Sequence, residues 1–158
     1  MEKQSTIHST FVLERSYPVP PEKVFAAFAD PAAKKRWNYG AGSHNLLEHT
    51  SNFAVGGGET AAMTLGANAG PVAGKRMTIE TRYQDIVPNR RLVWAYKMSM
   101  EGTPFSASLA TVELLKTDKG TDLILTHQGA YFENADGPEM RKGGWTDLLG
   151  KLGEELAR

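Results

Sequence analysis

The feature that most constrains this fold is a long run of strand-like segments, from Glu48 to Phe132, followed by a single amphipathic helix. Apolar residues alternate with polar ones in these segments, as strands require. Turn-forming stretches separate them: GGG (56–58), GANAGPVAG (66–74), PNR (88–90) and DKG (118–120). Because strands without intervening helices pair antiparallel, the sequence predicts an antiparallel meander of about six strands, with one helix after it.

The N-terminal part of the chain adds one more strand and two short helices. Residues 9–17 alternate between two faces, and the prolines that follow end this strand, because proline lacks the amide hydrogen that a sheet requires. Pro21 suits the first turn of a helix, and Asp30 with the next proline begins a second short helix that ends near Trp37. We therefore expect an α+β fold and, since no linker interrupts the pattern, one domain over residues 1–158.

The C-terminal helix carries one apolar stripe with the spacing of a single helix face: Trp145, Leu148, Leu149, Leu152 and Leu156. One such helix covers only one face of a wide sheet. We therefore expect the sheet to curve around the helix and to leave a pocket beneath it. Asp136, followed three residues later by Glu139, predicts a capping box at the start of this helix.

Two adjacent glycines, Gly143 and Gly144, lie within this helical pattern, although each costs about 1 kcal/mol relative to alanine in a helix interior. Two explanations stay open. Either the helix contacts the sheet closely or bends at these glycines, or Gly143 ends a short preceding turn and the helix begins at Trp145.

Composition and charge exclude several classes of protein. The 18 Lys and Arg residues balance the 18 Asp and Glu residues, which argues against nucleic-acid or anionic membrane partners. Without cysteine, neither disulfides nor thiolate chemistry are available. No apolar run approaches the roughly 20 residues of a membrane span, and the N-terminus lacks the apolar core of a signal peptide. We expect a cytoplasmic protein.

The polar residues form no known catalytic or metal-binding motif. The four histidines lack metal-ligand spacing, and phosphate-loop, serine-elbow and dinucleotide patterns are absent, so no catalytic residue, metal or cofactor is assigned. We expect His44 and His49 at the surface. His127 shares a strand face with leucines, which leaves a buried structural role, a polar contact in the cavity, or catalysis. Arg15 also lies on an apolar strand face, where it would form a buried ion pair or contact a ligand. Alternatively, the strand pattern breaks near Pro18 and leaves Arg15 in water.

Four segments together resemble the SRPBCC superfamily, the START-like or Bet v-like helix-grip proteins. They are ERSYPVPPEKVFAAFADPAAKKRW (14–37), YQDIVPNRRLVW (83–94), GTDLILTHQG (120–129) and GGWTDLLGKL (143–152). Within that superfamily the chain is most similar to the branch named after the activator of heat-shock-protein-90 ATPase. The resemblance implies a helix-grip fold: a seven-stranded curved antiparallel sheet wrapped around a long C-terminal helix, with two short helices between the first strands and an internal cavity.

The expected function is the binding of a small apolar or aromatic ligand between the sheet and the C-terminal helix. The residues predicted to line this cavity are Arg15, Trp37, Met77, Ile79, Tyr83, Trp94, Tyr96, Met98, His127, Trp145 and Leu149. The resemblance keeps two alternatives open. One is a cyclase, hydratase or hydrolase that uses Arg15, His127 and Tyr83 or Tyr96. The other is a cofactor that interacts with a chaperone. A homodimer is a further open possibility, whereas nucleic acid and membrane are not expected partners.

Overall fold

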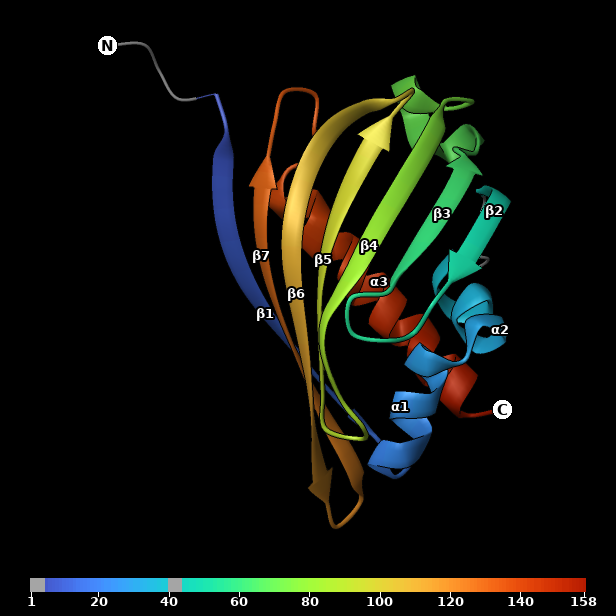
Figure 1. The fold of residues 1–158 in the computed structure, drawn as a ribbon, viewed down its shortest axis with the longest axis vertical. Coiled ribbons are helices and arrows are strands. Elements are labelled where there is room, and N and C mark those ends of the chain that lie inside the picture. The colour runs from blue at the N-terminus through green and yellow to red at the C-terminus, as the bar shows by residue number, and fades with distance from the viewer. Residues whose placement is uncertain (1–4, 40–43) are drawn as a thin grey trace.

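Seven antiparallel strands form one curved sheet, and the C-terminal helix α3 (Pro138–Leu156) lies across one face of it (Figure 1). The computed structural model describes residues 5–39 and 44–158. The strand order is β1-β7-β6-β5-β4-β3-β2, so β1 pairs with β7 and the other strands form a meander. The strands are β1 (Ile7–Tyr17), β2 (Asn45–Ser51), β3 (Gly58–Thr64), β4 (Arg76–Val87), β5 (Arg91–Met100), β6 (Thr103–Thr117) and β7 (Gly120–Tyr131).

Two short helices and a π-helical turn follow β1. Helix α1 (Pro21–Ala29) begins with proline as predicted, and α2 (Pro31–Lys34) is capped by the Asp30 carboxylate, which accepts a hydrogen bond of 3.1 Å from the Ala32 amide. The chain then continues as a π-helix, η1 (Lys35–Tyr39). Between β3 and β4, where the sequence predicted a loop, lies the short 3₁₀ segment η2 (Ala67–Val72).

The predicted α+β architecture, with seven antiparallel strands, short early helices and one long C-terminal helix, is confirmed. Bulges in β2, β4 and β6 shift the pairing register. A bulge bends its strand and increases the local twist, which curves the sheet around the helix. At the β6–β7 turn, Gly120 has φ +146, and a Cβ there would lie 2.1 Å from the Tyr17 carbonyl oxygen, so only glycine fits.

The main core lies where α1 and α3 meet the sheet. The predicted apolar stripe of α3 faces this core: Trp145, Leu149, Leu152 and Leu156 are buried, and Leu148 is partly buried beside them. Trp37 also belongs to the core, and its indole N–H donates a hydrogen bond of 2.9 Å to the Ala27 carbonyl. The early helices are therefore anchored to the same apolar interior as α3.

The helix α3 is continuous from Pro138, which corrects both explanations of its adjacent glycines. Within residues 5–39 and 44–158, a Cβ at Gly143 or Gly144 would meet no atom within 4 Å, so neither glycine serves a close approach to the sheet. The helix has no kink between Pro138 and Leu156, and it begins seven residues before Trp145. Gly144 borders the pocket described below, whereas Gly143 does not.

The predicted capping box of α3 is also wrong. The N-cap residue is Gly137, with φ +88, and no side chain caps this helix. The Asp136 carboxylate instead forms an ion pair with Arg141. Among residues 5–39 and 44–158, none of the helices has the length and apolarity that a membrane span requires. The same residues contain no group of three or more His, Cys, Asp or Glu side chains placed to hold a metal ion.

Candidate ligand-binding pocket

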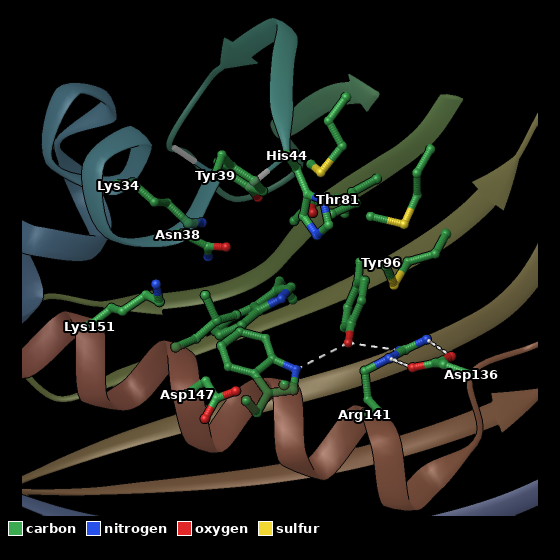
Figure 2. Close-up of a pocket in the computed structure, with 18 of the residues that line it drawn as sticks. Lys34, Asn38, Tyr39, His44, Thr81, Tyr96, Asp136, Arg141, Asp147 and Lys151 are labelled. Carbon is green, nitrogen blue, oxygen red and sulfur yellow. Dashed lines mark hydrogen bonds and ion pairs between the residues drawn. The ribbon is translucent and has the colours of Figure 1, made fainter. Parts of the chain in front are cut away.

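A pocket of about 350 Å³ lies between the sheet and one flank of α3 (Figure 2). Three adjacent strands, β3, β4 and β5, supply one wall, which consists of Met63, Met77, Ile79, Thr81, Trp94, Tyr96 and Met98. The helix supplies the opposite wall through Met140, Arg141, Gly144, Trp145, Asp147, Leu148 and Lys151. Phe28, Lys34, Asn38 and Tyr39 close the end nearest α2 and η1, with Asp136 and His44 also at the boundary.

The middle of the pocket is apolar. The indole rings of Trp94 and Trp145 lie 6.1 Å apart at an angle of 51°, so the sheet and the helix each present an aromatic surface. Met63, Met77 and Met98 line the wall from neighbouring strands. Methionine is flexible and polarisable, so such a wall adapts to ligands of irregular shape.

Gly144 occupies the middle of the helix flank that borders the pocket. Met140, Gly144, Leu148 and Lys151 recur at helical spacing along this flank, and all four line the pocket. Gly144 is exposed and has no side chain, so no side chain from this position covers the border of the pocket. Gly143 is exposed as well but does not line the pocket.

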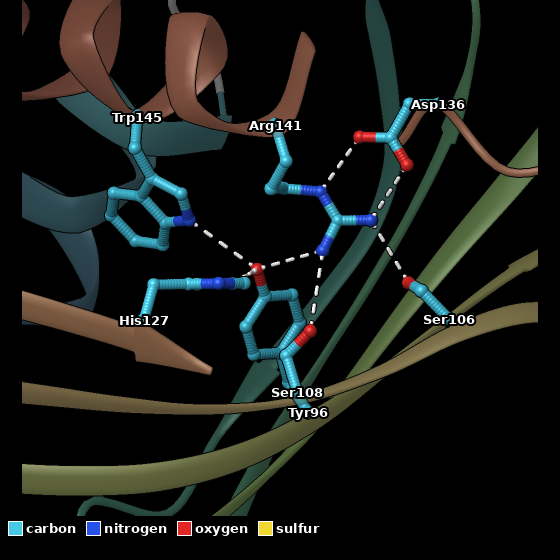
Figure 3. A network of polar contacts seen from close by, with 7 residues as sticks. All are labelled: Tyr96, Ser106, Ser108, His127, Asp136, Arg141 and Trp145. Atoms are coloured by element: carbon cyan, nitrogen blue, oxygen red, sulfur yellow. Dashed lines mark hydrogen bonds and ion pairs between the residues drawn. The ribbon is translucent and has the colours of Figure 1, made fainter. Parts of the chain in front are cut away.

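One end of the pocket is formed by a buried arginine whose hydrogen-bonding capacity is fully used (Figure 3). Arg141 binds Asp136 through two parallel hydrogen bonds, Nε to Oδ2 at 2.8 Å and Nη2 to Oδ1 at 2.9 Å. Its Nη2 also donates to the Ser106 hydroxyl at 2.9 Å, and its Nη1 donates to the hydroxyls of Tyr96 at 3.0 Å and Ser108 at 3.4 Å. All five guanidinium hydrogens therefore have protein acceptors.

The hydroxyl of Tyr96 connects this arginine to His127. It accepts hydrogen bonds from Arg141 Nη1 and from the indole nitrogen of Trp145, at 3.3 Å. A hydroxyl has one hydrogen and two lone pairs, so its hydrogen goes to His127 Nε2, 2.7 Å away. This arrangement assigns His127 as the neutral tautomer protonated on Nδ1. Burial, followed by the positive charge of Arg141, lowers the pKa of His127 from 6.5 to about 4.

The other end of the pocket contains a buried ion pair between Lys34 and Glu59. The two side chains are 6% and 1% exposed, and Lys34 Nζ lies 3.0 Å from Glu59 Oε1. Tyr39 donates a hydrogen bond to the same carboxylate, and Tyr83 donates to it at 3.4 Å while accepting from Lys34 at 3.3 Å. This ion pair thus links helix α2 to strand β3 at this end of the pocket.

Both members of this pair remain ionised at neutral pH. Burial by itself would lower the pKa of Lys34, but Glu59 and Tyr83 together leave it raised. Burial would raise the pKa of Glu59, but Lys34, together with the hydrogen bond from Tyr39, leaves it lowered. The ammonium also lies 5.7 to 5.9 Å from the ring centroids of Tyr39, Tyr83 and Trp94, a distance at which aromatic faces stabilise a cation.

Six of the eleven residues predicted from the sequence line this pocket: Met77, Ile79, Trp94, Tyr96, Met98 and Trp145. Trp37 and Leu149 are core residues, and Tyr83 and His127 lie behind the wall, where they hold the ends of the pocket through hydrogen bonds. Arg15 is half-buried on β1 away from the pocket, and its Nη1 donates to the neighbouring Glu14 carbonyl. It forms no ion pair within the described residues, so the expected buried ion pair is wrong, and it does not line this pocket.

Sequence reasoning missed the charged residues at both ends. Lys34, Glu59 and Arg141 are 5%, 3% and 6% exposed, although charged residues are almost never buried without a partner. The only available signal was the position of Arg141 on the apolar stripe, four residues before Trp145. His49, expected at the surface, is half-buried as a residue, but its side chain is only 6% exposed and its Nε2 lies 3.6 Å from Glu59.

Comparison with known proteins agrees with the family resemblance found in the sequence. The sequence model of the family described as Activator of Hsp90 ATPase homolog 1-like protein matches residues 18–157. The crystal structure of Mll3558 from Rhizobium loti is 42% identical, with 96% of this chain and 99% of that chain covered and a TM-score of 0.84. An uncharacterised protein from Rhizobium leguminosarum is 31% identical, with 98% and 97% covered and a TM-score of 0.88. The AHSA1-like protein from Aeromonas hydrophila, at 17% identity, 94% and 92% coverage and a TM-score of 0.67, shares the fold. No curated protein matches the chain.

Proposed function

The chain belongs to the family of Activator of Hsp90 ATPase homolog 1-like proteins, and from this premise we propose that it binds a small apolar or aromatic molecule between its sheet and helix α3. The observation that carries this proposal is the pocket itself. Its volume of about 350 Å³ lies within the range of ordinary ligand sites, and its middle is lined by tryptophan and methionine side chains.

The polar ends of the pocket support binding because contacts within the protein hold their side chains in place. Asp136 and two serine hydroxyls hold Arg141, and Glu59 with two tyrosines holds Lys34. A wall whose side chains are fixed in advance loses little conformational entropy when a ligand binds. The geometry therefore favours a carrier or sensor for a small molecule.

The same geometry gives less support to an enzyme. Of the residues considered for a cyclase, hydratase or hydrolase, only Tyr96 lines the pocket, and its hydroxyl already has three partners. His127 contacts that hydroxyl from behind and stacks on Phe11, with ring centroids 4.7 Å apart. A general acid or base has to reach the substrate directly or through one water. His127 is separated from the pocket by Tyr96.

The neutral fluorophore N-phenyl-1-naphthylamine tests this proposal, because its emission rises when it enters an apolar site. We expect saturable binding to the wild-type protein with one site per chain. The Gly144→Phe variant should weaken binding at least about tenfold, because the new ring would project from the border of the pocket. Gly143→Phe, on the same helix but outside the pocket, is the matched control and should bind as the wild type does.

Native mass spectrometry of the purified protein provides an independent measurement and would detect a molecule retained from the host. Saturable fluorophore binding that is blocked only by Gly144→Phe supports the proposal. Equal binding by both variants would place the fluorophore elsewhere on the protein and would contradict the proposal.

A further inference from the structure

The buried charges at the two ends of the pocket are compensated in pairs. Arg141 faces Asp136, and Lys34 faces Glu59, with separations of 2.8 and 3.0 Å. Two further charges, Asp147 and Lys151, lie one helical turn apart at the outer edge of the pocket, where water screens them. The pocket and the carboxylate behind it thus contain three cations and three anions.

Arginine side chains commonly bind carboxylates in proteins, but Arg141 is not available to a ligand here. Each of its five N–H groups already has a protein acceptor at 2.8 to 3.4 Å. An anion bound to it would have to displace Asp136 or a buried hydroxyl, which would leave that group without a partner. Leaving a buried polar group unpaired costs about 1–3 kcal/mol.

Lys34 offers a single remaining hydrogen bond. Two of its N–H groups contact Glu59 and Tyr83, and within residues 5–39 and 44–158 no acceptor takes the third. Asn38 lies four residues further along the same helical segment, also lines the pocket, and has no side-chain hydrogen bond within the described chain. An anion beside Lys34 would also lie close to the buried Glu59 carboxylate, which repels it.

We propose that the pocket selects electrically neutral ligands that have an aromatic or other apolar body and one hydrogen-bonding head group. The head group, a carbonyl or amide, contacts Lys34 and Asn38, while the body lies between Trp94 and Trp145. This inference rests on the binding function proposed above and specifies the chemical class of its ligand. Selection follows from desolvation, because a buried carboxylate without a new partner costs far more than a buried amide that keeps its hydrogen bonds.

Two ligands of nearly identical shape test this selection: naphthalene-2-carboxamide, which is neutral, and 2-naphthoate, which is an anion at neutral pH. We expect isothermal titration calorimetry to show the carboxamide binding at least about tenfold more tightly. Equal or tighter binding of 2-naphthoate would overturn the inference while leaving the binding function intact. If neither ligand binds, and N-phenyl-1-naphthylamine does not bind either, the proposed function fails and the inference with it.

A charge variant tests the cause of the selection. Glu59→Gln leaves Lys34 uncompensated, so the preference for the carboxamide over 2-naphthoate should fall about tenfold or more. Glu113→Gln makes the same chemical change on β6, at an exposed position outside the pocket, and should leave the preference unchanged. An unchanged preference in a folded Glu59→Gln variant would overturn the inference, and circular dichroism establishes that the variant is folded.

A second variant tests where the head group lies and does not disturb the ion pair. Asn38→Ala should weaken carboxamide binding about two- to tenfold, the net value of one hydrogen bond. Asn45→Ala, an exposed asparagine outside the pocket, is the control and should have no effect. If Asn38→Ala binds the carboxamide as tightly as the wild type does, the placement of the head group beside η1 is wrong.

Discussion

Replacing Gly144 with alanine should stabilise this protein, although the position lies at the border of its pocket. Glycine is the least favourable residue after proline in a helix interior, by about 0.8–1.0 kcal/mol relative to alanine. The added methyl group has room, because a Cβ at this position would meet no atom of the described part of the chain within 4 Å. Helix propensity therefore acts alone, and we expect a gain of about 1 kcal/mol in the free energy of unfolding.

Thermal denaturation followed by circular dichroism at 222 nm, a wavelength conventional for helix, measures this gain. For a domain of about this length, 1 kcal/mol corresponds to an increase in Tm of about 2–4 °C. Gly143→Ala should give a similar increase, because its Cβ would also meet no described atom within 4 Å. Side chains at adjacent helix positions do not face each other, so we expect the two propensity gains to add to about 2 kcal/mol in the double variant.

The two glycines should differ only in ligand binding. Gly144→Phe is expected to obstruct the pocket, and Gly143→Phe is not. If Gly144→Ala melts below the wild type, then Gly144 makes a close contact in solution and the reasoning from open space is wrong. If the two phenylalanine variants bind the fluorophore equally, the fluorophore does not occupy the pocket beside Gly144, and the proposed binding site is wrong.

Three further predictions concern the walls and ends of the pocket. Trp145→Ala should lower the free energy of unfolding by about 3–5 kcal/mol in urea denaturation, because it removes a buried ring from the contact between α3 and β5; a loss below about 1 kcal/mol would show that the ring is not a core residue. Glu59→Ala should cost a similar 3–5 kcal/mol, because Lys34 would remain buried without its partner, whereas replacing both by methionine should cost less; an equal cost for the two changes would contradict this explanation. His127 has a pKa of about 4 in the folded protein and 6.5 when unfolded, so the unfolded chain binds the proton first as the pH falls. The stability that neutral His127 confers is therefore present above about pH 6.5, and about 3 kcal/mol of it is lost by pH 4; His127→Gln should flatten this part of the pH profile, and an unchanged profile would refute the assignment.

The sequence left two protein partners open: a chaperone and a second copy of this chain. Binding to a chaperone and formation of a homodimer both stay predictions. Co-purification with the cognate chaperone and measurement of mass by light scattering would test them. Location in the cytoplasm likewise stays an expectation.

The order of the elements could be predicted from the sequence because its signals are local. Alternation with a period of two marks a strand, and the prolines after Tyr17 end β1 for a reason that involves only their own amide groups. The stripe from Trp145 to Leu156 marks the buried face of α3 in the same way. Strands in succession and one final helix left few architectures, so the fold and the apolar middle of the pocket followed from the sequence.

Only the tertiary structure decided the ends of the pocket and the role of the glycines. Lys34 and Glu59 are 25 residues apart, and Arg141 and Tyr96 are 45 apart, with no periodicity that connects them. Taken singly, Lys34 and Glu59 resemble ordinary surface residues, and Arg141 differs from one only by its position on the apolar stripe. Whether a charge is buried depends on the partner that folding brings to it, because the cost of removing a charge from water is offset only by a group close in space. For Gly144 the deciding fact was that, among the described residues, no atom lies within 4 Å of the place a Cβ would take, and only the three-dimensional structure shows this.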